Sequence, residues 1–337
     1  MTGLPCSGLA CSGLACLGFG YTAQAFVRRL YQGDQGSAFT GDPNDRAAPL
    51  ILGTTRQREK CDQIKKMRVL PLVLSGDNQK DARTLKANLR ANMDWLISIA
   101  PPRDSAIEND APNCPALDLI EEMIAAAPDD WPKPRMIAYL SSNGVYGDHD
   151  GAWVDETTKP EPTTPRGIRR LRAENAWRAF ADAHQVPITI FRLPGIYGPN
   201  RSALETVQSQ TARQIIKPGQ VFSRMHVDDI AQALFSARKR INEGAPLPTI
   251  LNLCDDEPAP PQDVLTYAAQ LLGCPAPPKT DITNADLSPM AASFYQDNKR
   301  VRNRLMKQTL GLTLAYPTYR EGLADLFERL KRKTETE

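Results

Sequence analysis

The sequence has almost no net charge. Lysine and arginine together number 41 and aspartate and glutamate 39, which leaves a formal net charge of +2 over 337 residues. A chain so nearly neutral has no strong overall field to attract nucleic acid or an anionic membrane surface. It also has no run of 18 or more apolar residues, the length that a membrane-spanning helix needs. We therefore expect a small-molecule substrate as partner, with no nucleic acid and no membrane.

Cysteine is present without a pattern that indicates a metal site or a disulfide framework. The seven cysteines form an odd set that lacks the paired short spacings of zinc sites and the density of secreted scaffolds. A CSGLA pentapeptide repeats near the start and places Cys6, Cys11 and Cys16 five residues apart, with no fourth ligand nearby. The first 27 residues lack the basic segment of a secretion signal. We expect reduced thiols, no bound metal and a cytoplasmic location.

The rest of the composition indicates a globular chain with a sizeable core. Hydrophobic residues make up 41% of the sequence and charged residues 24%. Apolar, strand-like runs alternate with helix-like ones, which is typical of a parallel sheet covered on both faces. After a first short strand, we expect further strands at 48–56, 69–77, 93–102, 135–147 and 186–199. Helices are expected at 57–67, 80–90, 115–127 and 168–183, and surface loops at 33–47 and 103–114.

A glycine-rich turn follows the first strand. The stretch LACLGFGYTAQAFVRRLY combines a short apolar strand that contains Cys16, a G-x-G-x-x-A turn and an amphipathic helix. In a dinucleotide-binding fold the first glycine permits the tight turn, the second lets the backbone approach a pyrophosphate, and the small third residue brings helix and strand together. The same small residues also serve a merely tight turn, so the motif alone leaves both readings open. The candidate cofactor-binding residues here are Gly18, Gly20, Tyr21, Thr22 and Ala23.

The end of the second strand bears on the choice of cofactor. Folds that select NAD normally place Asp or Glu there to hold the ribose 2′-hydroxyl group, whereas this strand ends in GTTRQREK. Thr55 and Arg56 suit a 2′-phosphate, so we expect NADP in preference to NAD. The alternative is that Arg56 merely begins a solvated helix.

Four further segments appear in the order that is typical of one enzyme group. They read YLSSNGVYGDHDGAWVDE, RRLRAE, FRLPGIYGPNRS and FSRMHVDDIAQAL. With the glycine turn, they make the chain resemble an atypical extended short-chain dehydrogenase/reductase of the NAD-dependent epimerase/dehydratase-like type. The resemblance covers roughly residues 12–235 and continues more weakly to the C-terminus.

The resemblance implies a fold and a division of the chain. The fold is α/β, a Rossmann-type doubly wound parallel sheet with a smaller C-terminal substrate lobe. The expected dinucleotide-binding domain is 12–195, and 196–330 forms mainly the substrate lobe. A segment near 222–254 is expected to return to the first domain, and 1–11 is expected to be a disordered extension. Members of the group also suggest a homodimer.

The resemblance assigns further residues to the cofactor. Ser98, Ala100 and Pro101 match the edge of the fourth strand, near the nicotinamide ribose. Pro194 and Gly195 match the loop that packs beside the nicotinamide ring.

The catalytic residues match the group only in part. Ser142 matches the serine that hydrogen-bonds the reacting carbonyl or alcohol group. The group's Tyr-x-x-x-Lys pair is absent, because alignment on Glu174 puts Arg166 at the tyrosine position and Arg170 at the lysine position. Arginine stays protonated at physiological pH and cannot exchange the proton that must accompany hydride transfer. Tyr146 is the candidate replacement acid, with a core aromatic as the alternative.

Two more segments have two possible interpretations, a role at the site or an ordinary structural role. His226 and Asp228 close the cofactor site in the group, although a helix capped by Asp228 explains the sequence equally well. Residues 298–300 either approach the substrate or are solvated.

Two functions follow from this sequence. The first is an NAD(P)-dependent oxidoreductase or epimerase that acts on a carbonyl or alcohol group, with a nucleotide-sugar-like substrate as one form. The second is a catalytically silent NADP-binding sensor or interaction module, which Arg166 and Arg170 favour.

Overall fold

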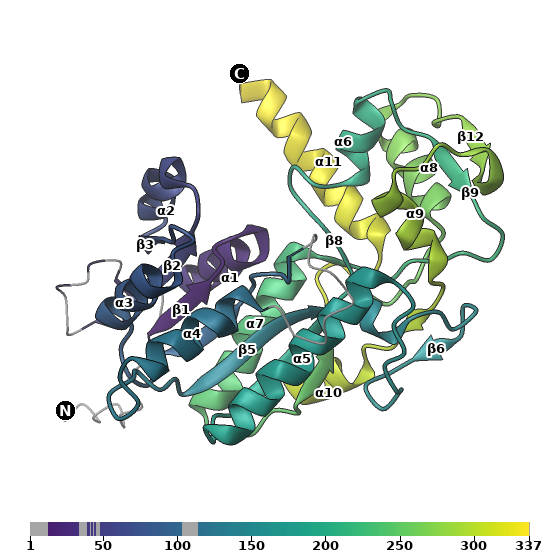
Figure 1. Cartoon of the computed structure of the whole chain (residues 1–337). Coiled ribbons are helices and arrows are strands. Elements are labelled where there is room, and N and C mark those ends of the chain that lie inside the picture. Colours follow the sequence, from purple (N-terminus) through teal and green to yellow (C-terminus); the bar gives the residue numbers. More distant parts are fainter. Residues whose placement is uncertain are drawn as a thin grey trace, which may run out of the picture.

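A seven-stranded parallel sheet carries the glycine turn. In this computed structural model, described for residues 13–33, 39, 40, 42, 44, 48–102 and 114–336, the strand order is β11-β7-β5-β4-β1-β2-β3 (Figure 1). The strands are β1 (Leu14–Leu17), β2 (Ile51–Thr55), β3 (Leu70–Val73), β4 (Asp94–Ile97), β5 (Met136–Ser142), β7 (Ile188–Leu193) and β11 (Ile250–Asn252). The chain order reverses between β1 and β4, so a crevice opens there at the carboxyl ends of the strands.

Helices cover both faces of this sheet. They are α1 (Tyr21–Gln32), α2 (Cys61–Lys66), α3 (Asn78–Asn88), α4 (Pro115–Ala125), α5 (Pro165–Ala183) and α7 (Val227–Asn242). One buried cluster includes Phe26 of α1 and Leu234 of α7, and the cluster on the other face includes Leu85, Leu117 and Trp177 from α3, α4 and α5. The predicted Rossmann-type α/β class is confirmed.

A second group of elements lies at the arrowhead end of β5 (Figure 1). It holds three two-stranded parallel sheets and four helices of the described chain. The strand pairs are β8 (Gly195–Tyr197) with β10 (Arg224–His226), β9 (Gln214–Ile216) with β12 (Lys279–Asp281), and β6 (Trp153–Val154) with β13 (Arg300–Val301). The helices are α6 (Ala203–Gln208), α8 (Pro261–Leu272), α9 (Pro289–Gln296) and α11 (Tyr319–Thr336). Helix α10 (Arg304–Leu310) packs against α7 and β11 on the main sheet instead.

Most predicted strands and helices occur close to the predicted positions, with two corrections. The run expected as one strand at 186–199 is two strands, because Pro194 has no N–H to donate and the chain then leaves the main sheet to pair with β10. The strand expected at 135–147 ends at Ser142, where a 3₁₀ turn, η3 (Asn143–Tyr146), begins.

One of the three cysteines near the start of the chain lies within the described residues. Cys16 is fully buried in β1, and burial raises the pKa of its thiol well above the usual range. Cys6 and Cys11 lie outside the described residues, as do residues 1–11 and most of the two predicted loops.

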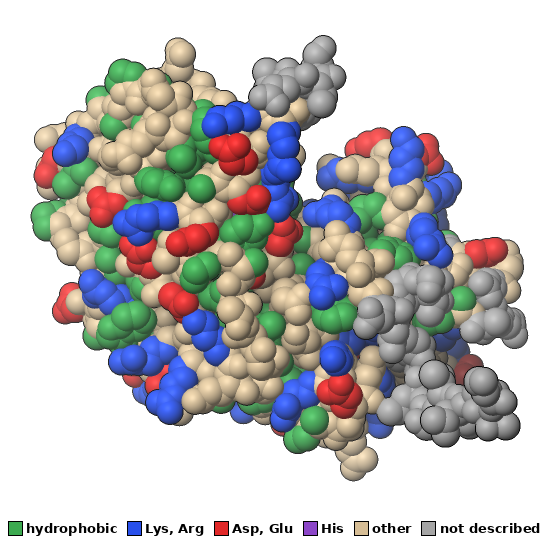
Figure 2. All heavy atoms as spheres, turned by 180° about the vertical axis from the view of Figure 1, so that it is seen from behind, with side chains coloured by type: hydrophobic (Ala, Val, Ile, Leu, Met, Phe, Trp, Pro, Cys, Tyr) green, Lys and Arg blue, Asp and Glu red, His purple; other side chains and the backbone are tan. Residues whose placement is uncertain are grey.

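Figure 2 shows acidic and basic side chains mixed over the rear face of the molecule. No helix in the described part of the chain combines the length and the apolar character that crossing a membrane requires.

Candidate active site

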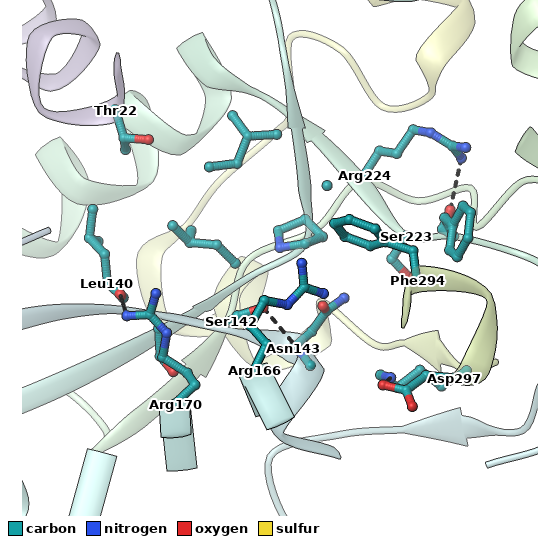
Figure 3. Close-up of a pocket in the computed structure, with 18 of the residues that line it drawn as sticks. Thr22, Leu140, Ser142, Asn143, Arg166, Arg170, Ser223, Arg224, Phe294 and Asp297 are labelled. Carbon is teal, nitrogen blue, oxygen red and sulfur yellow. Dashed lines mark hydrogen bonds and ion pairs between the residues drawn. The ribbon is translucent and has the colours of Figure 1, made fainter. Parts of the chain in front are cut away.

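A cavity of about 560 Å³ opens where the main sheet meets the second group of elements. The sheet side is formed by residues at the carboxyl ends of β1, β4, β5 and β7, and the opposite side by residues 221–224 and 293–299. Figure 3 shows the cavity extending from Thr22 and Arg170 at one end to Arg224 and Phe294 at the other. The two walls therefore come from parts of the chain that are far apart in sequence.

The glycine turn is held by hydrogen bonds from both neighbouring strands. Gly18 has a φ of +96°, its N–H donates to Thr54 Oγ1 at 2.8 Å, and its carbonyl accepts from Ser98 Oγ at 2.6 Å. A Cβ atom on Gly18 would lie 2.9 Å from Ser98 Oγ, so both the space and the backbone conformation require glycine.

Gly20 has no such internal reason to be glycine. A Cβ atom built on it meets no heavy atom within 4 Å. Gly20 is the N-cap of α1 and offers no side-chain hydrogen bond, and the first turn of α1 holds no acidic residue. The N–H groups at the start of α1 therefore face the cavity side of the turn without a competing anion, which suits a phosphate group.

The predicted cofactor residues divide into those that line the cavity and those that do not. The residues that line it are Gly20, Tyr21, Thr22, Ser98, Pro194 and Gly195. The residues outside the lining are Gly18, Ala23, Thr55, Arg56, Ala100 and Pro101. Ala23 is fully buried at the helix–strand contact, and Arg56 is exposed just after β2.

Ser142 lies at the carboxyl end of β5 and lines the cavity. Its Oγ accepts a hydrogen bond from the N–H of Gly144 at 3.2 Å and thereby caps the η3 turn. The hydroxyl hydrogen stays available for an acceptor in the cavity, because this bond uses only an oxygen lone pair.

Tyr146 does not reach the cavity. The η3 turn directs its side chain into the core, where it is fully buried and its hydroxyl donates to Asn252 Oδ1 at 2.9 Å. The guanidinium carbon of Arg192 lies 4.7 Å from the ring centroid. The hypothesis that Tyr146 replaces the missing acid thus loses its geometric basis, and the alternative, a core aromatic, describes its position.

Helix α5 presents both arginines to the cavity. Arg170 Nη1 donates to the hydroxyl of Tyr139 at 3.0 Å and to the carbonyl of Leu140 at 3.2 Å, the second of which is drawn in Figure 3. The guanidinium carbon of Arg166 lies 4.1 Å from the ring centroid of Phe294 in α9. The two positions expected for the catalytic pair therefore line the cavity, with cations that do not exchange protons.

A buried ion pair supports this wall from behind. Arg192 Nη2 lies 2.7 Å from Glu174 Oε2, and each side chain is 2% exposed. Ser141 Oγ donates a short hydrogen bond to the same carboxylate. The pair joins α5 to β7 and β5 directly beneath Ser142. In the sequence, Arg192 lies in the segment FRLPG, which predicts a strand and a cofactor loop but gives no sign of a buried ion pair.

Lys299 and Asp297 form a second polar group in the cavity wall. Lys299 Nζ donates to the carbonyl of Gly147 at 2.6 Å and to Asp297 Oδ2 at 3.1 Å. Lys299 is 8% exposed, and burial lowers the pKa of its ammonium group, while the carboxylate of Asp297 opposes that shift. From the sequence, residues 298–300 are expected either to approach the substrate or to be solvated. Lys299 lines the cavity, whereas Arg300 belongs to β13.

A second cavity of about 490 Å³ adjoins the first. Arg201 and Arg224 line both cavities, and α8 and α11 contribute the outer lining. Arg224 Nη1 donates to the carbonyls of Phe222 and Ala259 at 2.9 and 3.0 Å, which fixes the guanidinium at the junction. Sequence reasoning missed both arginines because the elements that place them are short and far apart.

His226 is the N-cap of α7, so the suggested Asp228 cap is wrong. The His226 ring accepts at Nδ1 from the N–H of Asp228 at 3.2 Å. Its ring centroid lies 4.1 Å from that of Tyr316, and burial lowers the pKa of His226 to about 4. The imidazole is therefore neutral at pH 7 and acts as a structural acceptor.

Comparisons with known proteins agree with this fold. Residues 116–254 match the NAD dependent epimerase/dehydratase family. A functionally unknown conserved protein from Silicibacter pomeroyi DSS is 41% identical, with a TM-score of 0.76, over 95% of this chain and 100% of that one. Residues 116–254 of this chain therefore form a domain of the NAD dependent epimerase/dehydratase family.

Two other similar proteins are described by their substrates. An uncharacterized UDP-glucose epimerase of Bacillus subtilis (strain 168) is 30% identical over 67 residues, which is 20% of this chain and 21% of that relative's length. The UDP-glucuronic acid 4-epimerase from Bacillus cereus, solved in complex with UDP-glucuronic acid and NAD, is 16% identical. That likeness covers 94% of this chain and 99% of that one at a TM-score of 0.68, and it shows the shared fold.

The chain therefore combines a well-formed glycine turn with two arginines, Arg166 and Arg170, on another part of the cavity wall. Gly20, Ser142, Arg166 and Arg170 line the same cavity, and Gly18 holds the turn beside it.

Proposed function

We propose that this protein binds NADP, or NAD, at the glycine turn and acts as an oxidoreductase or epimerase. The proposed reaction is at a carbonyl or alcohol group of a nucleotide-sugar-like substrate. The observation that carries the proposal is the single cavity in which the start of α1, Ser142 and Pro194 meet. Within the same proposal, residues 12–195 form the dinucleotide domain and 196–330 mainly the substrate lobe of a cytoplasmic homodimer.

The residues at the turn fit a dinucleotide. The open space at Gly20 and the uncapped start of α1 suit the pyrophosphate. Pro194 and Gly195 would lie beside the nicotinamide, and Ser98 near its ribose. When bound, the nicotinamide would supply or accept a hydride.

The end of β2 supports the preference for NADP. Residues 54–58 read TTRQR and contain no acidic side chain that would bind a ribose 2′-hydroxyl group. Arg56 is exposed directly after β2, where a guanidinium can contact a 2′-phosphate.

Ser142 is proposed to donate its hydroxyl hydrogen to the substrate oxygen. The Gly144 N–H fixes the serine oxygen, so the hydroxyl hydrogen can turn toward the cavity. That bond would orient the reacting carbonyl or alcohol group and stabilise charge that develops on its oxygen.

The substrate class is supported by the two adjoining cavities. Arg201 and Arg224 stand where the cavities meet, so a ligand that fills both would have its middle part beside two guanidinium groups. Guanidinium groups match phosphate oxygens well. A sugar joined to a nucleoside by a diphosphate has this distribution of charge, and the Bacillus cereus relative is described with such a ligand.

The alternative is a catalytically silent NADP-binding sensor or interaction module. Arg166 and Arg170 favour it, because an arginine at the tyrosine position cannot carry out the proton exchange of that tyrosine. The alternative predicts cofactor binding with no chemical turnover of any sugar substrate.

The first test is a titration of the purified protein with NADPH and NADH, followed by nicotinamide fluorescence. We expect the Arg56→Asp variant to lose about tenfold or more in NADPH affinity, about 1.4 kcal/mol, with little change for NADH. Arg178→Asp, an exposed position on α5, is the matched control. Equal losses for both nucleotides would contradict the role of Arg56, and no binding of either would contradict the cofactor assignment.

A further inference from the structure

The proposed reaction needs a group that exchanges a proton in the cavity. Transfer of a hydride to or from carbon must be matched by a proton at the neighbouring oxygen. With Tyr146 in the core, the described lining offers three ionisable side chains other than arginine, namely Tyr21, Asp297 and Lys299.

Tyr21 is already committed elsewhere. It begins α1, and its hydroxyl donates to the carbonyl of Pro199 at 3.0 Å. Burial raises the pKa of Tyr21 to about 12, so the phenol holds its proton across the physiological range. Its place at the glycine turn is also the place proposed for the pyrophosphate rather than for the reacting carbon.

Lys299 has both the proton and the position. An ammonium group has three N–H bonds, and Lys299 uses two acceptors, Gly147 and Asp297. A third N–H can therefore serve a ligand in the cavity that Lys299 lines. These two acceptors, one two residues away and one in a distant segment, hold the Nζ atom in one place.

The η3 turn connects this ammonium group to Ser142. The turn begins at Asn143, directly after Ser142, and ends at Tyr146, directly before the carbonyl that accepts from Lys299. One short turn therefore carries the Ser142 hydroxyl group at its start and the anchoring carbonyl for Lys299 at its end. Figure 3 shows Ser142, Asn143 and Asp297 around the same hollow.

We propose that Lys299 exchanges the proton with the substrate oxygen that Ser142 orients, and that Asp297 is its positioning residue. This inference rests on the proposed function. In the oxidation direction, the alcohol O–H bond breaks and a new N–H bond forms on neutral Lys299. The C–H bond breaks as the carbonyl forms, and the oxidised nicotinamide, when bound, would accept the hydride. In reduction, the ammonium returns that proton to oxygen.

The charges around Lys299 determine how the reaction depends on pH. Asp297 from the same segment and Asp148 from the loop after η3 raise the pKa of Lys299, whereas burial and Arg166 of α5 lower it, with burial the largest effect. The net shift is downward, which increases the fraction of neutral lysine at a given pH. Removal of the Asp297 charge lowers this pKa further, because the ammonium loses an adjacent anion.

The decisive variant is Lys299→Arg. Arginine keeps the positive charge and can bond both Gly147 and Asp297, but it does not exchange its proton. We expect the variant to fold and bind cofactor as before and to lose about 100-fold or more in the rate of the oxidation half-reaction. The assay is single-turnover oxidation of UDP-glucose or UDP-glucuronic acid by the loaded protein, followed by absorbance of the reduced nicotinamide.

Lys307→Arg is the matched control. Lys307 pairs with Asp256 at 2.6 Å in the same way but lies outside the cavity lining. We expect its rate to match that of the wild type. A Lys299→Arg rate within threefold of the wild type would overturn the proposal and assign Lys299 a structural role.

The Asp297→Asn variant tests the positioning role. The oxidation rate should rise with pH as Lys299 becomes neutral, and in this variant the rise should occur at lower pH. A second readout independent of turnover is the NMR titration of isotopically labelled lysine, with the Lys299 signal assigned by its loss in Lys299→Arg. We expect its pKa to be the lowest among the assigned lysines and to fall further in Asp297→Asn. If the oxidation rate of Asp297→Asn rises at the same pH as that of the wild type, the proposal is overturned.

The outcomes also separate this proposal from the proposed function. If the wild type oxidises a probe and Lys299→Arg does so equally well, the lysine assignment alone fails. If the wild type binds cofactor but oxidises neither probe, the proposed function and the lysine assignment fail together, and the silent sensor remains.

Discussion

The seven-stranded sheet and the three small sheets beside it are built by different kinds of pairing. In the main sheet, β1, β2 and β3 pair as neighbours along the chain, each followed by a helix that covers the sheet. In the small sheets, strands of two or three residues pair across long distances, as β6 at Trp153 does with β13 at Arg300. The difference shows that one wall of the cavity is decided by local sequence and the other by tertiary contacts.

The largest expected effect comes from breaking the ion pair behind the sheet wall. Glu174→Gln should lower the free energy of unfolding by about 3–5 kcal/mol, because it leaves the Arg192 charge buried without its carboxylate. Denaturant unfolding measures this loss. The control is Glu161→Gln at the exposed Lys159 pair, where we expect no measurable change. Equal stability of both variants would show that the buried pair does not hold α5 against the sheet.

A smaller effect is expected from substitutions of the two glycines of the turn. One should lower stability, and the other should weaken cofactor binding. Gly18→Ala should cost about 1–3 kcal/mol, because it combines a φ of +96° with a contact at 2.9 Å. Gly20→Ala meets no protein atom, so it should leave the thermal midpoint unchanged and weaken NADPH binding. Measurement of both quantities on both variants checks this, and unchanged binding in Gly20→Ala would contradict the proposed approach of the pyrophosphate.

The smallest expected effect concerns His226, on the side of the second group of elements. Its folded pKa of about 4 lies below the model-peptide value of 6.5, so the unfolded chain binds more protons between these values. Stability should therefore be lost as pH falls through this window, with a slope of at most about 1.4 kcal/mol per pH unit. His226→Asn keeps an N-cap acceptor and should flatten this slope in unfolding experiments. An unchanged slope would assign it to other groups.

The predictions made from sequence succeeded where the pattern was local. The strand at β1, the glycine turn and the amphipathic α1 could be predicted together, because Gly18 and the spacing of apolar residues carry the signal within about twenty residues. The sequence predicts Ser142 within the strand at 135–147, whereas that strand ends at Ser142 itself. The break at Pro194 was missed, because the apolar run continues through it and only the β10 partner shows the change of sheet.

The reacting end of the site could not be predicted in the same way. Tyr146 lies four residues after Ser142 in a segment that resembles a substrate pocket, yet the η3 turn buries it against Asn252, which is distant in sequence. Lys299 is a charged residue in a polar stretch, which sequence alone cannot distinguish from a solvated one. Its place in the cavity depends on the β6–β13 pairing and on the carbonyl of Gly147.

By itself, the sequence determined the alternation of strands and helices, the glycine turn and the absence of a Tyr-x-x-x-Lys pair, because each is a property of neighbouring residues. The tertiary structure alone decided which polar side chains share the cavity. Residues such as Ser142, Arg224 and Lys299 meet through strand pairs and carbonyl anchors that join distant segments. Short-range patterns specify secondary structure, whereas a site assembled from several segments depends on the packing that brings them together.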